Sequence, residues 1–202
     1  GKIGYIYIPD MGPEGLNEFS RYFYPQLDKE GLIIDDRANG GGNVSPMILE
    51  RLSREPYRLT MRRGSARIGT VPDAVQVGPK VCLINKYSAS DGDLFPWGFR
   101  ALGLGKLIGT RTWGGIVGIS GSLPYMDGTD IRVPFFTSFD PKTGSWIIEN
   151  HGVDPDILID NDPVKEWNGE DQQLDRAIQE VMKELQNRKP LPGVPTPRDF
   201  SK

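Results

Sequence analysis

The chain has 202 residues, of which 24 are basic and 27 acidic, for a formal net charge of −3. This length suits one domain with a sizeable core, and the near-neutral balance argues against nucleic-acid or anionic-membrane binding, which needs a clustered basic surface. One cysteine, Cys82, and one histidine, His151, exclude an internal disulfide and a multi-histidine metal site, and leave one candidate for a histidine base. No apolar run approaches the roughly 20 residues of a membrane span.

Apolar spacing along the chain predicts strands alternating with helices. Residues 3–8 are β-branched and aromatic, as in a strand, and a helical pattern opens at Pro13 and ends or kinks at Pro25. Further strands are predicted at 31–35, 57–63, 81–85, 106–109 and 145–149, with hairpin material from 120 to 136 around Asp127-Gly128. Further helices are predicted at about 45–54, 91–102 and 172–185. This βαβ series implies an α/β domain with a mostly parallel sheet.

The organisation predicted from this pattern is one domain and a tail. Residues 1–188 form the domain, and the Pro-rich residues 189–202 are expected to be extended or disordered. The chain opens on Gly1 and runs directly into a strand pattern, which we interpret as a piece of a longer protein.

Two loops follow strands of the predicted sheet, where the sites of such sheets gather. The first contains Asn39 and three glycines at 40–42, which suit either a tight turn or backbone N–H groups that bind an oxyanion or phosphate. The second is 87–93, where a serine precedes a helix, as a plain N-cap or as a nucleophile. Together, the two loops predict a nucleophile beside an oxyanion hole.

Five blocks then carry a resemblance to a known family. They are residues 3–8, 32–41, 88–93 (Ser-Ala-Ser-Asp-Gly-Asp), 108–114 and 149–157 (Glu-Asn-His-Gly-Val-Asp-Pro-Asp-Ile). In this order they resemble the C-terminal catalytic core of peptidase family S41, the tail-specific, C-terminal-processing serine proteases, and more narrowly its tricorn branch. The resemblance implies a ClpP/crotonase-like fold.

The resemblance also implies roles for individual residues. Ser90 matches the nucleophile, the N–H groups of Asp91 and of Gly41 or Gly42 match the oxyanion hole, and Glu149 matches the acid that orients a histidine.

The base departs from the family's pattern. Where the Ser-Lys members carry a lysine, this chain has Gly115, which cannot take a proton, and neither Lys86 nor Lys106 matches that position. The tricorn branch instead uses a histidine upstream of the block that resembles residues 3–8. His151 lies in a block that the family uses structurally, so hydrogen bonding near a turn is its expected role. We therefore expect the base to come from an absent upstream segment and this piece to be inactive or weakly active.

The other charged and aromatic residues near these loops are expected to have structural roles. Asp91 and Asp93 supply too few ligands for a metal, so no metal and no cofactor is expected. Arg62 and Arg63 are expected at a solvated strand end, and the aromatic residues Phe95, Trp97 and Trp113 in core packing.

Three functions remain open at this point. The first is a serine endopeptidase core that acts on peptides or unfolded proteins, with the upstream domains of a parent chain and a possible homo-oligomer as partners. The others are a non-catalytic ligand- or peptide-binding member of the fold, and a crotonase-like acyl-CoA enzyme. The expected compartment is the cytoplasm, with the periplasm as the alternative.

Overall fold

The computed structural model describes residues 1–65, 67–119 and 123–196. Five parallel strands form the central sheet, in the order β1-β2-β5-β6-β11. They are β1 (Ile3–Tyr7), β2 (Gly31–Asp35), β5 (Lys80–Ile84), β6 (Gly105–Gly109) and β11 (Ile157–Leu158). The predicted α/β class with a mostly parallel sheet is confirmed.

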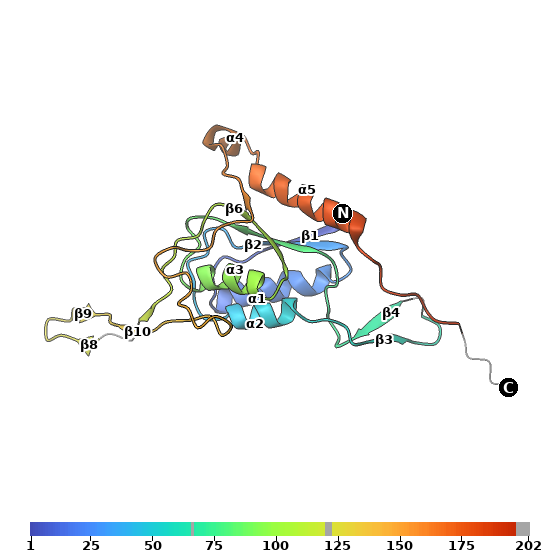
Figure 1. The fold of residues 1–202 in the computed structure, drawn as a ribbon, viewed down its shortest axis with the longest axis horizontal. Helices are drawn as coiled ribbons and strands as arrows, with labels where there is room; N and C mark the ends of the chain where they lie inside the picture. The colour runs from blue at the N-terminus through green and yellow to red at the C-terminus, as the bar shows by residue number, and fades with distance from the viewer. Residues whose placement is uncertain (66, 120–122, 197–202) are drawn as a thin grey trace.

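Helices cover both faces of this sheet (Figure 1). One face carries α1 (Pro13–Phe23), α2 (Ser45–Leu52) and α3 (Asp91–Ala101), and the other carries α5 (Gln172–Asn187). Strand residues alternate between the two layers: Ile34 and Cys82 pack in the core on the α1–α3 side, whereas Ile33 and Val81 pack against α5. The central strands β2 and β5 are buried on both faces, which explains why their sequences are nearly continuous apolar runs.

Two extensions leave the layered body at opposite ends (Figure 1). At one end β3 (Arg58–Met61) pairs with β4 (Ile68–Val71) in an antiparallel hairpin. At the other end is an arm built from β7 (Gly118–Ile119), β8 (Leu123–Pro124), β9 (Asp130–Ile131) and β10 (Pro134–Phe136). The predicted hairpin around Asp127-Gly128 is confirmed by the pairing of β8 with β9, while its first residues, 120–122, lie outside the described residues.

The remaining elements bring both agreement and corrections. Pro25 lies in the short 3₁₀ helix η1 (Tyr24–Gln26) that follows α1, which confirms it as the end of that helix. The strand predicted at 145–149 is wrong: only Trp146 bridges to Phe139, and a bend and turn follow. Sequence reasoning also missed β4, β11 and the helix α4 (Pro163–Trp167), all five residues or shorter.

The C-terminal segment leaves the body after α5. This helix ends at Asn187, and residues 188–196 have no helix or strand, while 197–202 lie outside the described residues. The boundary between domain and tail at 188/189 stays a prediction. None of the helices within the described ranges is long and apolar enough to cross a membrane.

Candidate active site

The serine turn follows β5, at the carboxyl end of the sheet. Ser90 is the N-cap of α3 with φ +56° and ψ −119°, a conformation that a non-glycine residue adopts only when its surroundings impose it. Its hydroxyl makes no capping hydrogen bond with α3. The neighbouring Ser88 is buried, and its Oγ donates to the carbonyl of Asp36 at 2.8 Å. Ser88 therefore braces the turn, and the half-buried Ser90 is left as the candidate nucleophile.

The glycine loop after β2 lies directly against this turn. A Cβ added to Gly41 (φ +97°) would lie 2.7 Å from both the Ala89 carbonyl oxygen and Ser90 Cβ, and 3.0 Å from the Asp91 nitrogen. The N–H of Gly41 donates to Asn39 Oδ1 at 2.9 Å. For the N–H groups of Gly42 and Asp91, no hydrogen bond is found within the described part of the chain. The two loops expected to meet do meet, and two amides there are unused.

Asn39 connects three parts of the site, and sequence reasoning assigned it no role. It is fully buried, and its Nδ2 donates to the Ile8 carbonyl at 3.0 Å while Oδ1 accepts from Gly41. Its own carbonyl accepts from the Ala89 N–H at 2.8 Å. Asn39 therefore ties the end of β1, the glycine loop and the residue before Ser90 to one another.

The Glu149 carboxylate is held by the segment that follows β6. Its Oε2 accepts from the N–H groups of Ile116 at 2.7 Å and Val117 at 3.0 Å. No hydrogen bond of Oε1 is found among the residues that the structure describes. Glu149 lies on a turn and not on the predicted strand, because its N–H donates back to the Ile147 carbonyl. One oxygen is thus anchored and the other remains available to a partner.

The two internal candidates for the base, His151 and Lys106, are each paired with a carboxylate. His151 is exposed, and its Nε2 lies 2.7 Å from Asp154 Oδ2, which matches the expected structural role near a turn. A Cβ added to Gly115 would lie 2.2 Å from the Trp113 ring, so that ring occupies the space a lysine would need. Lys106 pairs with Glu180 of α5, on the other face of the sheet.

Three aspartates near the site differ in role. The carboxylate of Asp91 accepts from the N–H and Oγ of Ser45 and thereby joins α3 to the start of α2. Burial raises the pKa of Asp36 well above its usual value, and the neighbouring aspartates raise it further. Burial also raises the pKa of Asp93, which accepts a hydrogen bond from the Gly114 N–H at 2.8 Å. Across the described residues, no group of three or more His, Cys, Asp or Glu side chains is placed to hold a metal ion.

The aromatic residues near the site split between core and surface. Phe95 is fully buried, as the packing interpretation expects, whereas Trp113 is 65% exposed. Trp113 nevertheless contacts the serine turn, because its N–H donates to the Ser88 carbonyl at 2.9 Å.

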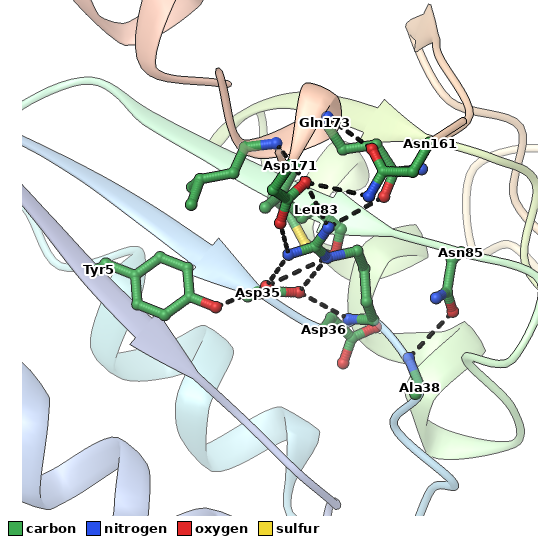
Figure 2. Close-up of polar contacts among 12 residues, drawn as sticks. Tyr5, Asp35, Asp36, Ala38, Leu83, Asn85, Asn161, Asp171 and Gln173 are labelled. Carbon is green, nitrogen blue, oxygen red and sulfur yellow. Dashed lines mark hydrogen bonds and ion pairs between the residues drawn. The ribbon is translucent and has the colours of Figure 1, made fainter. Parts of the chain in front are cut away.

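A buried ion-pair cluster lies at the end of β2, on the α5 side of the sheet. Figure 2 shows Tyr5, Asp35, Asp171 and Gln173 gathered there. Arg37 donates to Asp35 Oδ2 at 2.6 Å and to Asp171 Oδ2 at 2.8 Å, and Tyr5 Oη donates to Asp35 at 2.6 Å. These carboxylates raise the pKa of Arg37 against the opposing effect of burial. A pocket of about 620 Å³ opens over the cluster, but none of the predicted site residues lines it.

The layered α/β core places Ser90 on a helix-opening turn beside loop amides without a hydrogen bond in the described part of the chain. The chain belongs to peptidase family S41, whose sequence model matches residues 2–159.

Among relatives, it is 45% identical to the tricorn protease of Thermoplasma volcanium over 94% of this chain and 18% of that protein. It is 41% identical to a putative tricorn-like protease C-terminal subunit of Sulfurisphaera tokodaii, over 93% of this chain and 22% of the relative. The chain thus spans about a fifth of these relatives' length.

Solved structures give the same picture. A crystal structure of the tricorn protease matches with a TM-score of 0.86 and 44% identity, over 93% of this chain and 18% of that one. The photosystem II D1 C-terminal processing protease matches with a TM-score of 0.56 and 22% identity, over 78% of this chain and 42% of that one, which concerns the fold alone.

Proposed function

We propose that this chain is the catalytic core of a serine endopeptidase that forms an acyl-enzyme on Ser90. The observation that carries the proposal is the contact between Gly41 and the Ser90 turn, because it gathers a partly exposed hydroxyl and two unused amides in one place. The tricorn relatives and the family membership support a protease, and the roles of individual residues are part of the proposal.

Each group has a defined task in this mechanism. Ser90 Oγ attacks the scissile carbonyl carbon, and its proton passes to a histidine base. The carbonyl oxygen gains negative charge and accepts hydrogen bonds from the N–H groups of Asp91 and the glycine loop. Gly42 suits this task better than Gly41, whose N–H is bound to Asn39. The protonated histidine then gives its proton to the leaving amine, and water hydrolyses the acyl-enzyme.

The acid of the triad is Glu149. Its Oε2 is fixed by two backbone N–H groups, so Oε1 is oriented to accept the other N–H of the histidine ring. That histidine comes from an upstream segment of a longer parent chain, because His151 is paired with Asp154 at the surface. The isolated 202-residue chain is accordingly inactive or nearly so.

The proposed substrates are peptides or unfolded proteins, and the proposed partners are the parent's upstream domains and other copies of the chain. The cytoplasm stays the predicted compartment, with the periplasm as its alternative.

Fluorophosphonate labelling read by intact mass tests the proposal. The parent chain and this chain are each labelled as the native sequence, as Ser90→Ala, and as the control Ser20→Ala, at a half-buried serine of α1. We expect label on the parent and on its Ser20→Ala variant, and none on Ser90→Ala or on this chain alone. Label on this chain would show that the base lies within residues 1–202. An unlabelled parent overturns the proposal in favour of a non-catalytic binding module.

A further inference from the structure

The five residues 113–117, here the bridging segment, span the gap between the two turns that hold Ser90 and Glu149. On the Glu149 side, its last two N–H groups hold the Oε2 atom. The carbonyl of Gly114 also accepts from the Asn150 N–H at 2.7 Å. The contact is tight, since a Cβ added to Gly114 would lie 2.4 Å from the nitrogen of Gly152. Three hydrogen bonds thus join the bridging segment to the glutamate turn.

On the Ser90 side, the bridging segment is held by one main-chain and one side-chain acceptor. The Trp113 N–H donates to the Ser88 carbonyl at 2.9 Å, and the Gly114 N–H donates to Asp93 Oδ1 at 2.8 Å. Asp93 lies in the first turn of α3, and its own N–H donates to the Ser90 carbonyl at 2.9 Å. One side chain thus joins the helix that starts at Ser90 to the segment that holds Glu149.

Burial of the Asp93 carboxyl group is unfavourable for folding. It is fully buried, and its Oδ2 has no hydrogen-bond partner in the described part of the chain. A buried carboxyl oxygen without a partner lowers stability by about 1–3 kcal/mol or more. The helix N-terminus offsets part of that cost. The direct hydrogen bond of this carboxylate to another segment is the one that Oδ1 accepts from the Gly114 N–H.

We propose that Asp93 is a positioning residue that sets the separation between Ser90 and Glu149 through the bridging segment. The inference rests on the proposed function, in which these two residues belong to one triad. In this inference Asp93 acts through the bridging segment and not directly on substrate or histidine. Its loss displaces Glu149, and with it the histidine, from the nucleophile. A displacement of about 1 Å costs on the order of 100-fold in rate.

The test is peptide hydrolysis by the parent chain with Asp93 replaced. For Asp93→Ala we expect kcat to fall about 100-fold with KM within about twofold, because substrate binding does not depend on the triad. Asp93→Asn keeps an oxygen that accepts from the Gly114 N–H, and we expect it to restore kcat to within about threefold of the native enzyme. Asp73→Ala, at an exposed aspartate, is the matched control and keeps native kinetics.

A double-variant cycle separates positioning from a general loss of structure. If Asp93 acts through Glu149, then Asp93→Ala combined with Glu149→Gln is no slower than Glu149→Gln alone. Independent losses, which multiply in the double variant, overturn the inference, and so does an Asp93→Asn enzyme as slow as Asp93→Ala.

A replacement variant and the Ser90→Ala variant distinguish failure to fold, failure of the positioning role and failure of the proposed function. If Asp93→Ala does not fold, Asp93→Ser takes its place, because its hydroxyl is too short to hold Gly114 in the same position and the same loss is expected. If Ser90→Ala leaves hydrolysis intact, the proposed function itself fails. If Ser90→Ala abolishes hydrolysis while Asp93→Ala keeps native kcat, only the positioning role fails.

Discussion

Replacing Asn39 by alanine should destabilise the chain more than its size suggests. The substitution removes the Nδ2 donor to the Ile8 carbonyl and the Oδ1 acceptor of the Gly41 N–H, and it leaves both partners in place. The Ile8 site is fully buried, so its carbonyl then lacks a partner at a cost of about 1–3 kcal/mol, and the lost bond to the half-exposed Gly41 adds about 1 kcal/mol. We expect the free energy of unfolding to fall by about 2–4 kcal/mol.

The assay is urea denaturation of the 202-residue chain, followed by tryptophan fluorescence and circular dichroism. In thermal denaturation, a loss of this size lowers Tm by roughly 4–16 °C for a domain of this length. Asn168→Ala, at an exposed position at the end of α4, is the control and should change stability by less than about 0.5 kcal/mol. Asn39→Asp should also be destabilised, because a carboxylate oxygen then faces the Ile8 carbonyl. An Asn39→Ala chain as stable as the control would refute the view that this side chain holds the two loops together.

Three further substitutions test the same environment. Gly41→Ala should lose about 1–3 kcal/mol in urea denaturation, because its φ is positive and the new Cβ meets the Ser90 turn; Gly40→Ala, whose Cβ meets no atom within 4 Å, should lose less, and equal losses would count against the contact. Arg37→Met should lose about 3 kcal/mol by leaving the buried Asp35 carboxylate without its cation, and a loss below about 1 kcal/mol would contradict that pairing. Asp36→Asn should gain stability at pH 7. Because the folded pKa is raised, the native state holds a proton that the unfolded chain releases near pH 4, so native stability falls as pH rises above that value, by at most about 1.4 kcal/mol per unit. The gain should shrink towards pH 4 in denaturation series, and a gain independent of pH would rule this explanation out.

Local sequence was sufficient to predict the layered fold and two parts of the candidate site, the glycine loop and the serine turn. Strands buried on both faces need continuous apolar residues, so β2 and β5 stand out in the sequence as apolar runs. The turns after them contain the glycines and Ser90 because only certain residues suit such turns. The order of strands and helices then brings the two turns to the same sheet edge, and the contact of Gly41 with Ser90 agrees with that expectation.

Local sequence misjudged residues 145–149, because Trp146, Ile147 and Ile148 are aromatic and β-branched residues of the kind that favours strands. In the folded chain, the Glu149 carboxylate accepts from the N–H groups of Ile116 and Val117, and the Asn150 N–H donates to the Gly114 carbonyl. All three partners lie more than 30 residues earlier, and among the described residues the segment pairs only through the bridge of Trp146 to Phe139. Whether a β-like segment becomes a strand depends on a neighbouring strand, which propensity does not contain.

The sequence by itself thus determined the α/β class, the location of the serine and glycine turns, and the lack of a lysine at position 115. Only the tertiary structure decided which amides stay unused, that Asn39 joins three segments, and that Arg37 connects Asp35 to Asp171, 134 residues away from it. Turn and strand preferences act between residues adjacent in the chain. Hydrogen bonds and ion pairs depend instead on which distant groups the folded core brings within about 3 Å of one another.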